Sequence, residues 1–224
     1  MANPSQIPMN LLHPVSFDLS DFIVSASNDS AFRFLTTFAD SDIHFGALVG
    51  PVGCGKSHLL RGWGKEQDAI SICPDDDLSD LKAGQLYIID DINQLGKNGE
   101  FSYTDDFLFH LYNWAKEIKA TVVVTADIAP SRWGRRLPDL VSRLGTIQVA
   151  IIEQPDDELL LVLLVKLFSD RQLQVNIDVL NYIVSRIERS FGAARDFVDL
   201  VDKTALAEKK KITKALVRTC LESL

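Results

Sequence analysis

Hydrophobic positions divide the chain into two parts with different periodicity. Before residue 155, short continuous apolar runs alternate with stretches in which apolar residues recur every three or four positions. Continuous runs predict strands covered on both faces, as in a parallel sheet, and the longer spacing predicts helices. The predicted strands are residues 43–49, 69–73, 86–91, 120–127 and 146–152, and the predicted helices are residues 29–38, 57–63 and 105–119. This alternation predicts an α/β fold with a parallel five-stranded sheet.

From residue 155 onward the pattern predicts helices alone. The helix that begins at Asp156 is apolar on nearly all sides, which predicts burial against several neighbours or an apolar contact face. Further helices are predicted at residues 178–189, from 192, and at 211–221. We therefore expect three parts: an arm at residues 1–16, an α/β domain at 17–154 and a small all-α lid domain at 155–224.

Composition limits which partners and which cellular compartment are expected. The 224 residues carry a net charge of −8, which argues against broad binding of duplex DNA, because such binding depends on Lys and Arg. No run of about 18 uncharged apolar residues is present and the first residues lack a secretory signal, so we expect a cytoplasmic protein with no membrane partner. The three cysteines lie far apart, without the spacing of zinc or disulfide frameworks.

The strongest chemical signal is the phosphate loop (residues 50–57), Gly-Pro-Val-Gly-Cys-Gly-Lys-Ser, which fits G-x-x-x-x-G-K-[ST]. Glycines let the backbone N–H groups face phosphate oxygens, Lys56 adds a mobile positive charge, and Ser57 holds Mg²⁺ through its hydroxyl. The strand before the loop and the helix after it complete an anion site. We therefore expect ADP or ATP with Mg²⁺. The expected nucleotide contacts in this region are Gly50, Gly53, Cys54, Gly55, Lys56, Ser57 and His58.

Two further strand ends carry polar residues. The strand at 86–91 ends in Asp90 and Asp91, the Walker B arrangement, and strand ends of this kind meet at the ligand crevice of an open α/β sheet. We expect Asp90 to support Mg²⁺ and Asp91 to orient or deprotonate the attacking water. At the tip of the strand at 120–127, either Thr125 or Asp127 is placed to reach the γ-phosphate.

Arginine is concentrated in one short stretch, at positions 132, 135, 136 and 143. Its rigid fork of donors suits phosphate or carboxylate recognition, so we expect this cluster to serve such a role. Ahead of the phosphate loop, Phe22 to Val24 offer an apolar contact for the adenine base, or simply core packing.

The arm contains a short linear pattern. Gln6, Met9 and Leu11 form Gln-x-x-Met-x-Leu, in which an amide orients an extended peptide and two apolar side chains fill a pocket. The pattern resembles the peptide by which bacterial proteins dock on the replicative sliding clamp.

Taken in order along residues 17–207, these signals resemble the AAA+ ATPases and, within them, the DnaA/Hda family of bacterial replication proteins. Gly-Lys-Ser-His-Leu-Leu, Ile-Asp-Asp-Ile and Val-Val-Thr-Ala-Asp carry the likeness. The resemblance implies sensor roles for Asp127 and Arg195 and an arginine finger at Arg143. A family member with a clamp-binding arm and no helix-turn-helix domain after the lid is expected to inactivate DnaA, by docking on DNA-loaded clamp and stimulating ATP hydrolysis. Its partners would be DnaA and the clamp, with DNA contacted mainly through the clamp, at the nucleoid, and a homo-oligomer is an option.

Two positions depart from the family pattern. Asp139 stands where DnaA usually has a second arginine, and Ala126 stands where a serine is common. Both departures predict weak or no turnover by the chain alone. The alternatives are an autonomous AAA+ ATPase, such as a helicase loader or a DnaA-like initiator fragment, and, less favoured, a small-molecule kinase. A separate alternative is that the loop amides lower the pKa of Cys54 and make it redox-sensitive, against a purely structural small residue.

Overall fold

The computed structural model describes residues 18–39, 41–96 and 99–223. Its centre is a parallel sheet of five strands in the order β2-β3-β4-β1-β5. The strands are β1 (Phe45–Val49), β2 (Ile70–Ser71), β3 (Leu86–Ile89), β4 (Thr121–Ala126) and β5 (Gln148–Ile151). The predicted α/β class with a five-stranded parallel sheet is confirmed.

Register places the functional strand ends together. Val49 at the end of β1 pairs with Ala126 at the end of β4, and Ile89 at the end of β3 pairs with Val124. The carboxyl ends of all three strands therefore lie at one edge of the sheet, where ligands bind in open α/β folds. The residues that follow these strands are the phosphate loop, the Asp90–Asp91 pair and Asp127.

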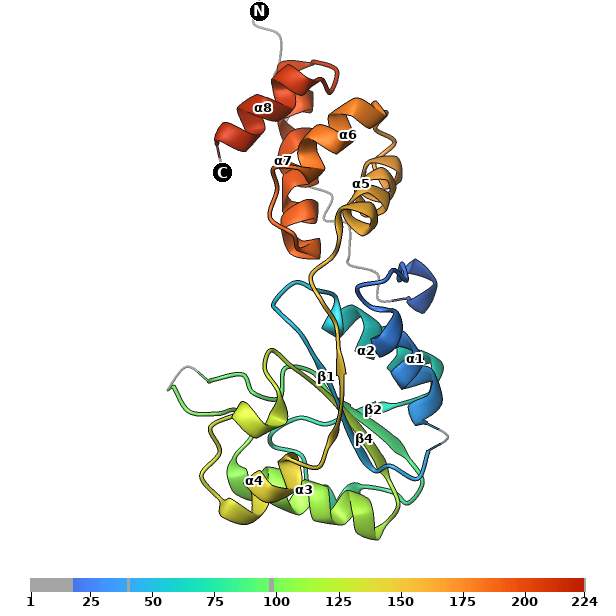
Figure 1. Cartoon of the computed structure of the whole chain (residues 1–224), viewed down its shortest axis with the longest axis vertical. Helices are drawn as coiled ribbons and strands as arrows, with labels where there is room; N and C mark the ends of the chain where they lie inside the picture. Colours follow the sequence, from blue (N-terminus) through green and yellow to red (C-terminus); the bar gives the residue numbers. More distant parts are fainter. Residues whose placement is uncertain (1–17, 40, 97–98, 224) are drawn as a thin grey trace, which may run out of the picture.

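Helices cover both faces of the sheet (Figure 1). On one face, α1 (Asp29–Phe38) and α2 (Lys56–Glu66) contribute Leu35, Phe38 and Leu60 to a buried apolar cluster. On the other face, α3 (Asp105–Glu117) and α4 (Pro138–Leu144) contribute to a second cluster. Three short 3₁₀ helices complete this part: η1 (Leu19–Asp21), η2 (Leu78–Asp80) and η3 (Pro130–Arg132).

The C-terminal helices form a separate bundle with its own apolar core, beyond the carboxyl edge of the sheet (Figure 1). They are α5 (Asp157–Asp170), α6 (Ile177–Val184), α7 (Phe191–Glu208) and α8 (Lys214–Glu222). Side chains at the N-caps of three of them, Asp156, Ser190 and Thr213, accept hydrogen bonds from backbone N–H groups and so fix where each helix begins. We call residues 157–223 the lid bundle.

Several predicted bounds were wrong. The predicted strand at 69–73 has only two residues, Ile70 and Ser71; both are exposed, and among the described residues β2 pairs on one side only. The last helix begins at Lys214, not 211, because Thr213 caps it. Burial of α5 is partial: Leu160 and Leu164 are fully buried in the lid bundle, whereas Val162 and Val165 are exposed.

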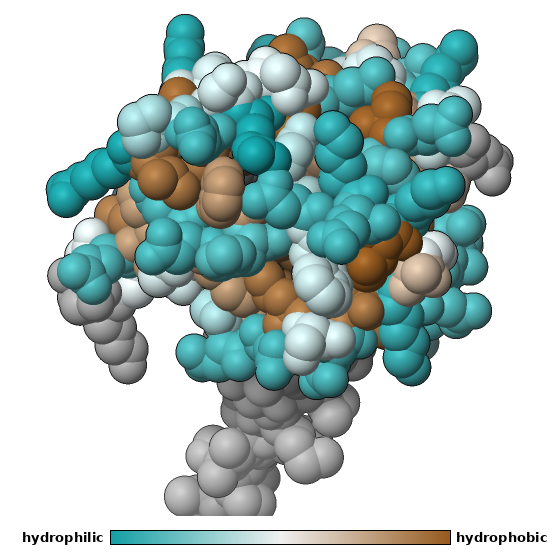
Figure 2. Space-filling view, turned by 90° about the horizontal axis from the view of Figure 1, so that it is seen from below, coloured by the Kyte–Doolittle hydropathy of each residue, from teal (hydrophilic) through white to brown (hydrophobic). Residues whose placement is uncertain are grey.

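No helix in the described part of the chain is both long and apolar enough to cross a membrane. Figure 2 shows the end of the molecule that carries α3 and α4, where apolar side chains lie in small patches separated by hydrophilic residues.

Candidate functional site

The phosphate loop curls between β1 and α2. Gly53 and Gly55 have φ angles of 76° and 100°, which L side chains rarely adopt. Gly55 is the N-cap of α2, so the first N–H groups of that helix open into the loop. A Cβ on Gly53 would lie 2.8 Å from the Ser190 Cβ atom, so a side chain there would also push the lid bundle away. The cradle therefore fits a phosphate group bound by backbone amides.

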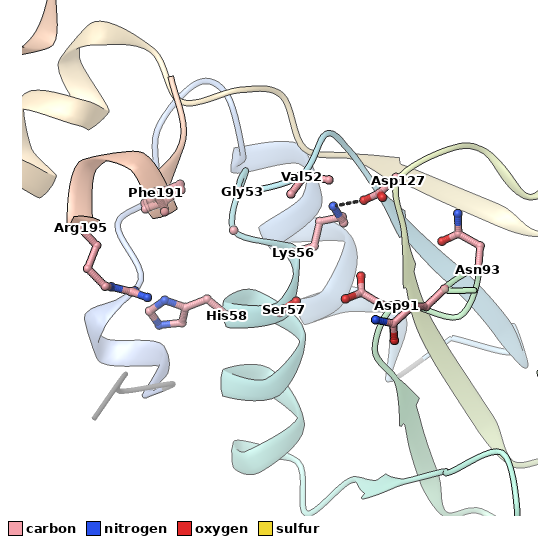
Figure 3. A pocket seen from close by; sticks show the side chains of 13 residues that line it. Val52, Gly53, Lys56, Ser57, His58, Asp91, Asn93, Asp127, Phe191 and Arg195 are labelled. Carbon is pink, nitrogen blue, oxygen red and sulfur yellow. Dashed lines mark hydrogen bonds and ion pairs between the residues drawn. The ribbon is translucent and has the colours of Figure 1, made fainter. Parts of the chain in front are cut away.

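Lys56 lies inside this cradle. Its ammonium group donates hydrogen bonds to the carbonyl oxygens of Gly50 (2.8 Å) and Pro51 (3.0 Å) and to Asp127 Oδ1 (2.9 Å). The side chain is 5% exposed, whereas that of Asp127 is 46% exposed. A single buried cation thus ties the loop to the tip of β4 (Figure 3).

Asp90 is joined to the loop helix and to β4. Its Oδ1 accepts hydrogen bonds from Ser57 Oγ (2.9 Å) and from Thr125 Oγ1 (2.6 Å), and its Oδ2 pairs with Arg61 at 2.8 Å. The structure therefore brings together the predicted magnesium residues. Because Mg²⁺ is usually held by one or two protein oxygens plus phosphate oxygens, Ser57 and Asp90 fit a nucleotide-bound ion. Among the described residues, no group of three or more His, Cys, Asp or Glu side chains forms a metal cluster.

Thr125 is buried in the fold, whereas Asp127 lines the cavity. Thr125 is fully buried, and its hydroxyl accepts a hydrogen bond from the Asp91 backbone N–H at 2.8 Å while donating to Asp90. Thr125 thus organises the Walker B turn, and of the two open choices for the strand tip only Asp127 lines the cavity.

Asp91 enters the cavity from a turn with a positive φ angle. Its φ angle is 54°, the left-handed region, which is uncommon for residues other than Gly, Asn and Asp. Burial raises the pKa of the Asp91 carboxyl, with a further increase from the neighbouring Asp90 and a partly compensating effect of Lys56. A carboxyl with a raised pKa beside a nucleotide is chemically suited to accept a proton.

The lid bundle closes the other side of the cavity. The Phe191 N–H donates to the Gly53 carbonyl oxygen at 2.9 Å, so the first residue of α7 is hydrogen-bonded to the phosphate loop. One turn further, Arg195 also lines the cavity, and its guanidinium points toward His58 of α2 (Figure 3). The cavity has a volume of about 460 Å³, within the range of small-molecule sites.

Aromatic rings gather beside Gly55. A Cβ on Gly55 would lie 3.4 Å from the Phe191 ring and 3.7 Å from the Phe22 ring. The Phe22 and His58 rings meet edge to face with centroids 5.7 Å apart. This group offers flat apolar faces next to the phosphate cradle, as a purine base requires. Phe22 also packs against the apolar cluster under α1 and α2, so the base contact stays a prediction, and Val24 is 44% exposed.

The cavity contains residues that the sequence analysis did not name as expected contacts: Val52, Asn93, Gln94, Phe191 and Gly192. Asn93 and Gln94 follow the Walker B pair within three positions, which was the available signal. Phe191 lies one helical turn before Arg195, but only the fold reveals that this turn touches the loop.

Cys54 lies outside the cavity. Its side chain is 2% exposed and packs in the apolar cluster under α1 and α2. Burial raises the pKa of this thiol, and this effect outweighs the lowering by Lys56. The alternative of a thiol with a lowered pKa was therefore wrong, and a nucleotide can meet Cys54 only through its backbone. Gly50 likewise serves through its carbonyl oxygen, bound to Lys56.

Arg143 lies far from the phosphate loop, on α4 at the opposite end of the sheet (Figure 1). Its guanidinium donates to Asn113 Oδ1 and lies over two rings of α3, 4.8 Å from the Phe109 centroid and 5.6 Å from the Tyr112 centroid. The structure therefore separates Arg143 from every predicted nucleotide contact.

The arginine cluster is not one surface, contrary to the expectation from the sequence. Arg135 is buried: it donates to the Tyr103 carbonyl oxygen at 2.6 Å, pairs with Asp105, and its guanidinium carbon lies 3.9 Å from the Phe101 ring centroid. It binds backbone and side chains of the fold itself, which spacing along the sequence could not reveal. Gln6, Met9 and Leu11 lie outside the described residues.

Comparisons with known proteins agree with this architecture. Residues 157–221 match the family model described as "Hda, lid domain". The chain is 28% identical over 220 residues to the chromosomal replication initiator protein DnaA of Nostoc punctiforme, covering 82% of this chain and 47% of that protein. An uncharacterized protein of Haemophilus influenzae is 27% identical over 187 residues, covering 78% of this chain and 80% of that protein. The chain thus spans about half the length of the DnaA relative.

Solved structures show the same fold. Domain III of the Thermotoga maritima replication initiation protein DnaA has a TM-score of 0.75 at 20% identity, covering 94% of this chain and 98% of that domain. AMPPCP-bound DnaA from Aquifex aeolicus has a TM-score of 0.68 at 18% identity, covering 88% of this chain and 68% of that one. The fold is that of an AAA+ core followed by a helical lid.

Proposed function

We propose that this chain, which is similar to DnaA proteins and whose residues 157–221 match the Hda lid model, is a negative regulator of chromosomal replication initiation. In this proposal it holds ADP or ATP in the phosphate loop and docks on the DNA-loaded sliding clamp through Gln6, Met9 and Leu11. It then stimulates ATP hydrolysis by DnaA through Arg143. It works at the nucleoid, in the cytoplasm, and meets DNA mainly through the clamp.

The observation that best supports the proposal is the position of Arg143. The guanidinium lies half-buried on α3 at the end of the core opposite the phosphate loop, so it cannot serve the chain's own nucleotide. An arginine supplied in trans stabilises the charge on a neighbour's γ-phosphate and can raise the rate by about 10³- to 10⁵-fold. The two aromatic rings and Asn113 restrict the side chain before a partner arrives, which lowers the entropy lost on docking.

The chain's own nucleotide has a structural role in this proposal. The loop amides, Lys56 and Ser57 would hold its phosphates and Mg²⁺, and Arg195 and Phe191 would contact it from the lid bundle. The relative from Aquifex aeolicus was solved with the ATP analogue AMPPCP, which supports nucleotide binding at this site. Since core and lid both line the cavity, a bound nucleotide would fix the angle between them.

Replacing Arg143 tests the proposal. In Arg143→Ala, we expect the DnaA ATPase rate in the presence of DNA-loaded clamp to fall by about 10³-fold relative to the stimulated rate. Clamp pull-down and ADP affinity should stay unchanged. Arg136→Ala is the matched control, because Arg136 is an exposed arginine seven positions away. A stimulated rate equal to wild type in Arg143→Ala would refute the finger.

A second candidate is an autonomous AAA+ ATPase, in which homo-oligomers place Arg143 against the loop of the next copy. One observation favours it: Asp91 lines the cavity with a raised pKa, as a water-activating base requires. Turnover by the purified chain without DnaA or clamp distinguishes the two. Substantial turnover that rises with protein concentration and disappears in Arg143→Ala would favour this second function.

A further inference from the structure

A groove lies on the α3 side of the core, away from the nucleotide cavity. It has a volume of about 490 Å³ and runs between η2 and α3. Asp76, Asp77 and Leu78 form one wall, and Phe107 and Trp114 lie on the facing side of α3. The two α3 residues are seven positions apart and so lie on one face of the helix.

A smaller cavity of about 150 Å³ continues this groove. It shares Asp76, Asp77 and Leu78 with the first cavity and reaches Ile70 of the edge strand β2. Ile70 is 45% exposed, and within the described part of the chain β2 pairs only with β3. The combined groove therefore reaches an open strand edge, which suits an extended segment of polypeptide.

The charge of the groove has one sign. Residues 66–81 contain acidic side chains at positions 66, 68, 75, 76, 77 and 80 and no Lys or Arg. Across the groove, Glu117 adds a carboxylate from α3, and no Lys or Arg of the described residues lines either cavity. Asp77 accepts a hydrogen bond from the Ser79 N–H, which lowers the pKa of its carboxyl and keeps it charged at neutral pH.

The floor of the groove is aromatic. Phe107 and Trp114 are half-buried, and Trp114 Nε1 is buried without a hydrogen-bond partner among the described residues. Ring faces next to carboxylates attract a guanidinium by cation–π and charge-assisted contacts together. Phosphate backbones would be repelled by the acidic wall, which excludes nucleic acid as the occupant.

We propose that this groove binds an extended segment of a protein partner through an arginine side chain that enters between Trp114 and the carboxylates of Asp76 and Glu117. Asn113 also lines the groove and is the residue that binds Arg143. The segment would therefore belong to the same partner whose nucleotide Arg143 reaches. This identification of the partner rests on the proposed function, whereas arginine recognition by the groove does not.

The first experiment uses the full chain and a small probe. The indole N–H resonance of Trp114, identified by its loss in Trp114→Phe, is followed by NMR during titration with N-acetyl-arginine amide. We expect a saturating shift with this probe and none with N-acetyl-citrulline amide, which has nearly the same shape without the charge. The shift should disappear in Asp76→Asn/Glu117→Gln and remain in the control Asp170→Asn/Glu188→Gln, which removes two exposed charges from the lid bundle. Equal shifts with both probes, or in both double variants, would overturn the proposal.

The second experiment tests whether DnaA is the protein whose arginine enters the groove. In the clamp-dependent assay, Asp76→Asn/Glu117→Gln should raise the DnaA concentration for half-maximal stimulation about tenfold, the loss of one desolvated charge contact, and leave the maximal rate unchanged. Arg143→Ala should instead lower the maximal rate. If Arg143→Ala has no effect, the proposed function fails while the probe result stands. If the double variant binds DnaA like wild type, DnaA is excluded as the source of the segment.

Discussion

The two ends of the core carry sites of opposite design. At the phosphate-loop end, polar groups bind one another across three elements: Lys56 binds Asp127, and Ser57 and Thr125 bind Asp90. At the other end, Arg143 rests on aromatic rings with a single amide partner among the described residues, Asn113.

The phosphate-loop end is suited to bind a ligand, whereas the Arg143 end is suited to supply a positive charge to another molecule. A network with several fixed donors around a cradle binds a phosphate whose place is defined in advance. A guanidinium on ring faces keeps hydrogen-bond donors free, since a cation–π contact uses the ring face and not the N–H groups. The phosphate loop therefore suits binding of the chain's own nucleotide, and Arg143 keeps N–H donors available for a group on another molecule.

The largest effect is expected from removing the buried cation of the phosphate loop, Lys56. Lys56→Ala should lower ADP affinity by about 10- to 100-fold, because a charge-assisted contact of roughly 1.5–3 kcal/mol is lost. Calorimetric titration with ADP measures this effect, and Lys203→Ala, an exposed lysine of α7, is the control. Unchanged affinity would mean that the loop end does not hold phosphate.

A second prediction concerns the contact between lid and loop. Ser190→Ala removes the hydroxyl that accepts a hydrogen bond from the Ala193 N–H, and should destabilise the protein by about 1 kcal/mol. ADP affinity should fall as well, since Ser190 packs on Gly53. Thr213→Ala removes the equivalent cap from α8, far from the loop, and should destabilise without affecting ADP. Chemical unfolding and ADP titration of both variants make the comparison; equal ADP affinities would show that the lid contact is only structural.

The smallest expected effect is at Asp91. Burial disfavours its ionised form in the folded protein, so the ionised carboxylate lowers the free energy of unfolding at neutral pH. Asp91→Asn should therefore stabilise the protein by about 0.5 kcal/mol at neutral pH, since Asn also tolerates the positive φ. The gain should shrink as the pH falls through the raised pKa, because wild-type Asp91 then becomes neutral too. Urea unfolding at about pH 8 and about pH 5 checks the trend, with Glu153→Gln as control. A gain that is independent of pH would contradict it.

Much of the fold and of the phosphate loop could be predicted from patterns within short stretches of sequence. Continuous apolar runs predicted β1, β3 and β4, because a strand buried on both faces excludes polar residues regardless of its partners. The phosphate loop was readable because Gly53 and Gly55 meet a backbone requirement that only glycine satisfies easily.

Other features depend on contacts between segments distant in sequence. Phe191 reaches the loop through a hydrogen bond to Gly53, and Thr125 turns inward to Asp90 rather than toward the ligand. Arg135 and Arg143 look alike in the sequence, yet one is buried on Tyr103 and the other lies on α3 at the surface.

By itself, the sequence determined the sheet, the helical lid and the chemistry of the phosphate loop, because periodicity and backbone requirements are local. Only the tertiary structure decided which charges meet. It placed Lys56 on Asp127, buried Arg135, and set Arg143 beside an acidic groove at the far end from the loop. The physical reason is that a side chain's burial and partners follow from how strands and helices pack, and that packing brings together residues separated by 30 to 138 positions in the chain, from Asn113 with Arg143 to Gly53 with Phe191.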